Sequence, residues 1–136
     1  MQKIARLLIA EEVRLGESSA TEAQAAIRVC QKVGGMLVSL AGARGSQSLL
    51  ARALALGARE AAWLGGITIR DDGTLATTAE VELEITKKEA AVGGVILVTG
   101  LLNLLETFLG EAMTLRLVRQ IWPGVSLKDV KNIGSK

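Results

Sequence analysis

The chain has no histidine and only one cysteine, Cys30. Histidine is the usual general base and a common zinc ligand, so its absence removes the familiar nucleophile pairs and zinc sites. A single thiol forms no internal disulfide and is typical of a reducing compartment. We therefore predict no enzymatic activity, no metal, no cofactor and a cytoplasmic location, with Cys30 a small buried apolar residue.

Aromatic residues are also scarce, with two tryptophans, one phenylalanine and no tyrosine. Proteins that bind single-stranded nucleic acid need exposed aromatic side chains on which bases stack. The charges nearly balance, with 16 basic and 14 acidic residues and a net charge of +2. Neither observation gives a reason to expect a nucleic-acid partner.

Proline occurs once, at Pro123, so no earlier residue forbids long helices. Apolar residues make up 49% of the chain, and most of them are leucine, alanine, valine and isoleucine. Alanine and leucine are strong helix formers, and 136 residues is a single-domain length. We predict an all-α or nearly all-α bundle of four to five helices over residues 1–124. A lysine-rich tail, 125–136, is expected to fray.

Hydrophobic spacing and breaker residues set the expected helix boundaries. In the first helix Ile4, Leu7, Leu8 and Val13 are expected to form the buried stripe. Glycines at 42 and 45 end the second helix. The expected helices cover residues 2–14, about 21 to 42, 46–64, about 80 to 109, and 111–122.

The segment 65–78 differs from the rest of the chain. It contains β-branched residues and an Asp-Gly turn dipeptide, which predict a short hairpin or an ordered loop. The stretch EVELEI at 80–85 alternates as a strand does, whereas Glu84 and Lys88 have the i, i+4 spacing of a helical ion pair. We favour the helix and keep the strand as an alternative.

The longest uncharged run, 90–105, is shorter than the roughly 20 apolar residues that a membrane span needs. No belt of aromatic residues flanks it. The amphipathic helices elsewhere need an apolar element to cover. The sequence therefore favours a central packing helix in a soluble bundle, and membrane association remains the less favoured alternative.

Two apolar helices contain a double glycine, in VGGMLVSLAG (33–42) and VGGVILVTG (92–100). A glycine inside a helix costs roughly 1 kcal/mol relative to alanine, so these glycines need a reason. Either the helices cross at small residues, within one chain or between two chains, or the similarity is chance. The candidate contact residues are Gly35, Ser39, Gly93, Gly94 and Gly100.

Polar residues in the apolar C-terminal third are the other candidates. Asn103 and Glu106 interrupt the central helix, and Glu111 follows it. A buried carboxylate needs a partner, and Arg116 and Arg119 are the nearest. These residues are either solvated and ion-paired, or they line a ligand pocket or a subunit interface.

Trp122 precedes Pro123 at the end of the last helix. It is expected to dock that helix onto the bundle, and the alternative is an exposed interface anchor. Arg44, Arg52 and Arg59 could form a basic strip for an acidic protein partner, unless they are simply solvated.

Three functions follow from these features. The first is a non-enzymatic interaction or regulatory module that self-associates as a dimer or higher oligomer, because a bundle of this size cannot hide all its apolar residues. The second is a binder of a small apolar or amphipathic ligand between helices near Asn103 and Glu106. The third is a membrane-associated helical protein.

Overall fold

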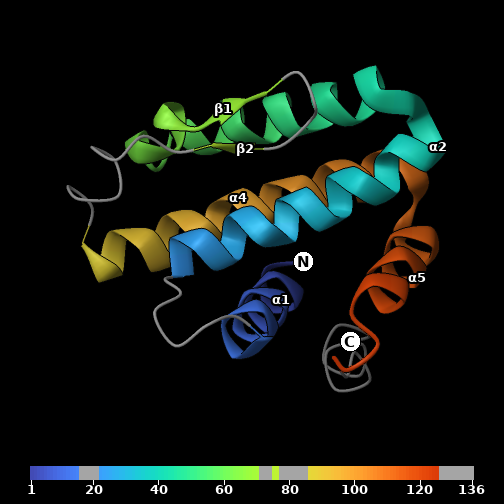
Figure 1. Ribbon diagram of the computed structural model, residues 1–136, viewed down its shortest axis with the longest axis horizontal. Helices are drawn as coiled ribbons and strands as arrows, with labels where there is room; N and C mark the ends of the chain where they lie inside the picture. Colours follow the sequence, from blue (N-terminus) through green and yellow to red (C-terminus); the bar gives the residue numbers. More distant parts are fainter. Residues whose placement is uncertain (16–21, 71–74, 77–85, 126–136) are drawn as a thin grey trace.

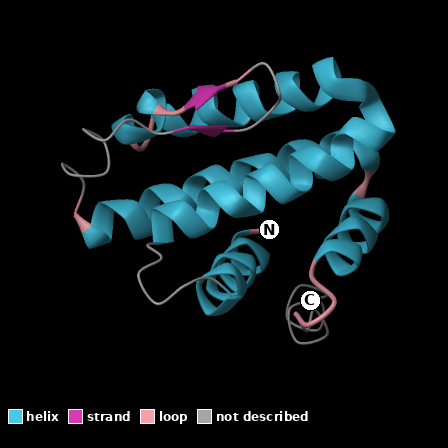
Figure 2. Cartoon of the chain, in the orientation of Figure 1, coloured by secondary structure: helices cyan, strands magenta, loops and turns pink. Residues whose placement is uncertain are grey.

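The computed structural model describes residues 1–15, 22–70, 75–76 and 86–125 (Figure 1). Within them the chain forms four α-helices, one 3-10 helix and a two-stranded antiparallel sheet (Figure 2), which confirms the predicted nearly all-α fold. The segment 80–85 and the tail from 126 onwards lie outside the described residues. The elements are α1 (Gln2–Leu15), α2 (Glu22–Ala58), η1 (Ala62–Gly66), β1 (Thr68–Ile69), β2 (Leu75–Ala76), α4 (Lys87–Leu109) and α5 (Glu111–Ile121).

A sharp bend at Gly42 divides α2 into two arms that fold back on each other (Figure 1). Gly42 has φ 78°, a left-handed conformation that only glycine adopts without strain. The predicted break at Gly42 is therefore confirmed, whereas Gly45 lies inside the second arm. That arm ends at Ala58 and not at Leu64, since the chain turns there so that η1 can bury Leu64.

The two arms of α2 approach closely at Gly34. The Ser46 hydroxyl donates a hydrogen bond of 2.8 Å to the Gly34 carbonyl. A Cβ atom added at Gly34 would lie 3.1 Å from Leu50 Cδ1. A small residue at this position thus allows the second arm to pack against the first.

Helix α4 is central, because α1, α2, α5 and η1 all contact it. A capping box begins it: the Glu89 amide donates to the Thr86 hydroxyl, and the Thr86 amide donates to the Glu89 carboxylate. It ends at Gly110, which has φ 87° and starts α5 in a new direction. Within the described residues, α4 is the one helix long and apolar enough to cross a membrane by length and composition, and 39% of its most apolar stretch is buried.

Helix α1 buries a somewhat different face from the predicted one, turned about the helix axis by about one residue position. Ile4 and Leu8 are buried as expected, but Leu7 and Val13 are exposed, so that part of the prediction is wrong. The buried residues of α1 are Ile4, Ala5, Leu8, Ile9 and Glu12. Ile4, Leu8 and Glu12 are four residues apart, as are Ala5 and Ile9, so all five lie on one face of the helix. This face places the Glu12 carboxylate in the core.

The predicted hairpin at 65–78 is present as the β1–β2 pair, with Thr68 opposite Ala76 and Ile69 opposite Leu75. It lies along the second arm of α2 (Figure 2). The Gln31 side-chain amide donates a hydrogen bond of 3.2 Å to the Leu75 carbonyl, which ties the hairpin to the first arm as well.

Candidate functional site

Three side chains from distant parts of the chain meet at the buried Glu12 carboxylate, in a cluster that we call the polar junction: Glu12, Lys32 and Trp122. Trp122 Nε1 donates a hydrogen bond of 2.7 Å to the Glu12 carboxylate. The Lys32 ammonium forms an ion pair with the same oxygen. Glu12 is only 2% exposed and Trp122 is buried, so the junction holds α1, α2 and the end of α5 together.

Trp122 therefore docks the last helix onto the bundle, as predicted, and it is not an exposed interface anchor. Glu12 is not among the residues that the sequence singles out. It shares a helix face with Ile4 and Leu8, since positions four apart lie on one side of a helix, but the exposed Glu106 has the same spacing from Val98 and Leu102. A buried carboxylate is costly unless it is paired, and Lys32 and Trp122 supply the pairing.

A second tryptophan contact lies on α4. Trp63 of η1 donates a hydrogen bond of 3.0 Å from Nε1 to the Glu89 carbonyl. Its indole ring covers Gly93, where an added Cβ atom would lie 2.3 Å from Nε1. Gly93 thus makes room for an indole, and a crossing of two helices at this glycine stays a prediction.

The other small-residue candidates differ among themselves. Gly94 is buried, whereas Gly35 and Ser39 are exposed. A Cβ atom added at Gly35 or at Gly100 would meet nothing within 4 Å. No helix crosses at Gly35 or Gly100 within the described chain, and their role in contact between two chains stays a prediction.

The predicted polar candidates near the end of α4 and on α5 lie on the surface of the described structure. Asn103, Glu106 and Glu111 are exposed, and Arg116 and Arg119 on α5 are exposed too. None of these five forms an ion pair with another described residue. Of the predicted alternatives, exposure to solvent therefore describes Glu106 and Glu111, and a role for them in a subunit interface stays a prediction.

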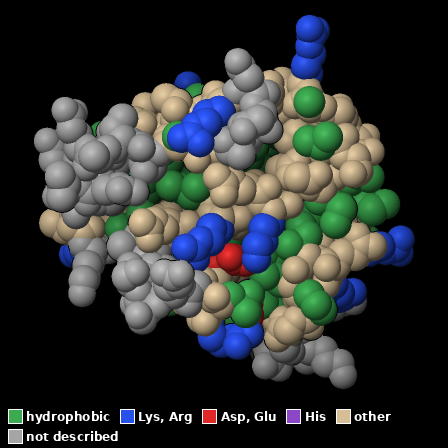
Figure 3. Space-filling view, in the orientation of Figure 1, with side chains coloured by type: hydrophobic (Ala, Val, Ile, Leu, Met, Phe, Trp, Pro, Cys, Tyr) green, Lys and Arg blue, Asp and Glu red, His purple; other side chains and the backbone are tan. Residues whose placement is uncertain are grey.

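Exposed apolar side chains gather at the end of the molecule where α2 bends and α4 meets α5. We call these four residues the bend-end surface: Val38, Leu40, Phe108 and Met113. Phe108, the chain's only phenylalanine, is 63% exposed. Figure 3 shows hydrophobic side chains on this side of the molecule with Lys and Arg side chains beside them.

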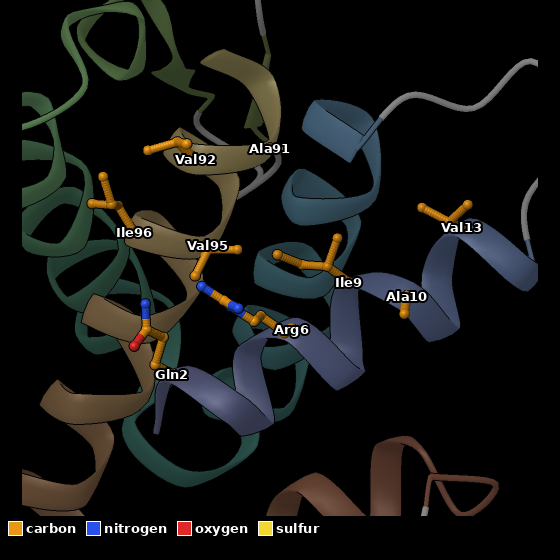
Figure 4. A pocket seen from close by; sticks show the side chains of 9 residues that line it. All are labelled: Gln2, Arg6, Ile9, Ala10, Val13, Ala91, Val92, Val95 and Ile96. Carbon is orange, nitrogen blue, oxygen red and sulfur yellow. The ribbon is translucent and has the colours of Figure 1, made fainter. Parts of the chain in front are cut away.

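A groove of about 560 Å³ lies between α1 and the first half of α4 (Figure 4). Its walls are mainly aliphatic and include Ile9 and Val13 of α1 and Val92, Val95 and Ile96 of α4. Two polar side chains, Gln2 and Arg6, line it from α1, and both point toward α4 (Figure 4). The groove is thus one apolar hollow with a single cationic group, and it lies at the opposite end of α4 from the pocket predicted near Asn103 and Glu106.

Among the described residues, no three His, Cys, Asp or Glu side chains come together in a way that could hold a metal ion. Cys30 is fully buried in the core, and burial raises the pKa of its thiol to about 12. A thiol with so high a pKa is a poor nucleophile at neutral pH, since the thiolate is the reactive form.

Comparisons with known proteins add no further information about the site. No family model, no curated protein and no solved structure matches this chain.

Proposed function

We propose that this chain is a non-enzymatic interaction module that self-associates, and that a second copy docks on the bend-end surface. The observation that carries the proposal is the exposure of Phe108, Leu40 and Met113 on elements that end at the same end of the molecule. Aromatic residues and methionine are enriched at protein interfaces.

The charges around the bend-end surface favour a second copy of the chain over a partner that is wholly acidic or wholly basic. Glu106 and Glu111 lie beside Phe108 in the sequence, Arg116 follows on α5, and Arg44 follows the bend of α2. All four are exposed and none forms an ion pair with a described residue. In a two-fold interface the same patch meets itself, so a patch that carries both signs can pair its acids with the bases of its copy.

Light scattering on the purified chain in detergent-free buffer tests the proposal. We expect a monodisperse species of twice the 14.3 kDa chain mass. The Phe108→Asp variant should shift that species to the monomer, because a buried charge without a partner is costly at an interface. The matched control is Leu56→Asp, which places the same charge on an exposed leucine of the second α2 arm and should leave the dimer intact.

Reversal of the two acids tests the charge argument separately. The double variant Glu106→Lys, Glu111→Lys makes the surface wholly basic, so we expect a weaker dimer whose dissociation lessens at high salt. A wild-type chain that remains monomeric up to millimolar concentration would contradict self-association.

Membrane association is the second candidate function, and the apolar character of α4 is the observation that favours it. The same preparation separates the two. Recovery of the chain only with detergent or with lipid vesicles would favour the membrane, whereas a detergent-free dimer favours the interaction module.

A further inference from the structure

From the groove between α1 and α4 we infer a second binding site, distinct from the bend-end surface, whose ligand is a single-chain amphipathic anion such as a medium-chain carboxylate. The size of the groove, about 560 Å³, falls in the range of small-molecule sites, and a single acyl chain fits that range better than a protein helix does. The inference concerns a different face from the proposed self-association and does not depend on it.

The walls of the groove define the apolar part of the ligand. Ile9 of α1 faces Val95 of α4 across the hollow (Figure 4). Val92 and Val13 extend this apolar lining, and both are exposed, Val92 by 52%. A flexible hydrocarbon chain laid along these side chains would remove them from water, at about 25 cal/mol for each Å² of apolar area that is buried.

Arg6 defines the head group. Its side chain extends from α1 to a position beside Val95 (Figure 4), and it forms no ion pair with any described residue. The described acids of α1 and of the first turn of α4 are engaged elsewhere: Glu11 pairs with Arg14, Glu12 lies in the polar junction, and Glu89 caps α4. An arginine in an apolar hollow with no acid of its own fits a carboxylate, which a guanidinium binds through two parallel hydrogen bonds.

The same charge argues against a second copy of the chain as the occupant. A two-fold contact through this groove would bring two Arg6 side chains toward each other, with no acid from the described walls to separate them. Gln2, the other polar residue of the groove, is uncharged and can donate a further hydrogen bond to a carboxylate oxygen.

Isothermal titration of the full chain with dodecanoate, below its micelle concentration, tests the site. We expect one dodecanoate per chain, and at least tenfold weaker binding of 1-dodecanol, which has the same hydrocarbon chain without the charge. The Arg6→Gln variant should bind dodecanoate about tenfold more weakly and dodecanol unchanged. Its matched control, Arg52→Gln, removes an exposed arginine of α2 outside the groove and should bind both ligands as the wild type does.

A second variant fills the groove while residue 6 stays arginine. Ala10 lines it and is exposed, so Ala10→Trp should abolish binding of both ligands while the helical circular dichroism stays unchanged. Phe108→Asp should leave dodecanoate binding intact, which separates this site from self-association.

Three outcomes would overturn the inference. They are equal affinity for dodecanoate and dodecanol, a folded Ala10→Trp variant that binds normally, and sedimentation with anionic phospholipid vesicles in the absence of any dodecanoate binding. The last outcome would assign the groove to a membrane surface instead.

Discussion

The two tryptophans of this chain fasten different segments to the bundle by different chemistry. Trp122 is buried and donates its indole hydrogen to the Glu12 carboxylate, which also pairs with Lys32. Trp63 is half-buried and donates to a backbone carbonyl, that of Glu89, while its ring lies over Gly93. The first contact joins α5 to α1 and α2, and the second joins η1 to α4.

The difference determines how each contact fails. The polar junction depends on groups that are present, so loss of Lys32 or Trp122 leaves the buried Glu12 carboxylate with one partner fewer. The contact at Gly93 depends on a side chain that is absent, so it fails when a side chain is added. Removal of a side chain therefore tests the polar junction, and addition of a side chain tests the contact between Trp63 and Gly93.

Loss of the Trp122 side chain should have the largest effect. We expect Trp122→Ala to lower the free energy of unfolding by about 4 kcal/mol, because a large buried side chain is removed and a cavity remains. Trp122→Phe keeps most of the apolar volume but loses the indole donor to Glu12, and it should cost about 2 kcal/mol. Urea denaturation followed by circular dichroism measures both values.

The Trp122→Phe variant separates the contribution of packing at the polar junction from that of the hydrogen bond to Glu12. Equal stability of Trp122→Phe and the wild type would show that packing alone docks α5 and that the hydrogen bond to Glu12 contributes nothing. Because Trp63 remains, its fluorescence reports whether η1 stays on α4 while α5 is loosened.

Addition of one methyl group at Gly93 should have the next largest effect. Gly93→Ala places a Cβ atom where the Trp63 indole lies, so we expect a loss of about 2 kcal/mol from overpacking, even after the gain in helix propensity. Gly100→Ala, in the same helix, meets open space and should stabilise the chain by about 0.5 to 1 kcal/mol. Thermal unfolding gives the two changes opposite signs, and a shared sign would contradict the account of Trp63.

Neutralisation of Glu12 should have a smaller effect. Glu12→Gln keeps an oxygen acceptor for Trp122 but removes the charge that pairs with Lys32, so we expect a loss of about 1.5 kcal/mol. The control, Glu60→Gln, changes an exposed carboxylate without an ion pair among the described residues, and its unfolding free energy should stay within about 0.5 kcal/mol of the wild type. Equal costs for the two substitutions would show that the burial of Glu12 has no energetic consequence.

The sequence was sufficient for the fold because its signals are local. Helix formers, the break at Gly42 and the β-branched run after residue 66 each act over a few residues. The helices, the bend and the β1–β2 pair are present in the structure, whereas the Asp-Gly dipeptide at 72–73 lies outside the described residues. The end of α2 at Ala58 was not predictable in this way. It depends on where Trp63 and Leu64 find partners, and one of those partners, Gly93, lies on another helix.

The candidate sites were less predictable, because burial is a property of the whole fold. Glu12 lies four and eight residues after the buried Leu8 and Ile4, and Glu106 lies four and eight residues after the buried Leu102 and Val98, yet only Glu12 is buried. Lys32 and Trp122, which make that burial tolerable, lie 20 and 110 positions away in the chain. The groove needs the same long-range information, since α1 and α4 form its walls together.

The smallest effect should come from Cys30, which is fully buried in the first arm of α2. Its thiol has a pKa of about 12 in the fold, against 9.0 in an unfolded chain, because burial disfavours the thiolate. The unfolded state therefore releases this proton first as the pH rises, and the stability that depends on the buried thiol is lost between pH 9 and pH 12. Between pH 8 and pH 10 the wild type should lose about 1 kcal/mol relative to Cys30→Ala, as measured by urea denaturation of both at each pH. A difference in unfolding free energy between wild type and Cys30→Ala that stays constant with pH would contradict this prediction. It would mean that the thiol ionises equally in the folded and unfolded states, and that the core around Cys30 is open to water.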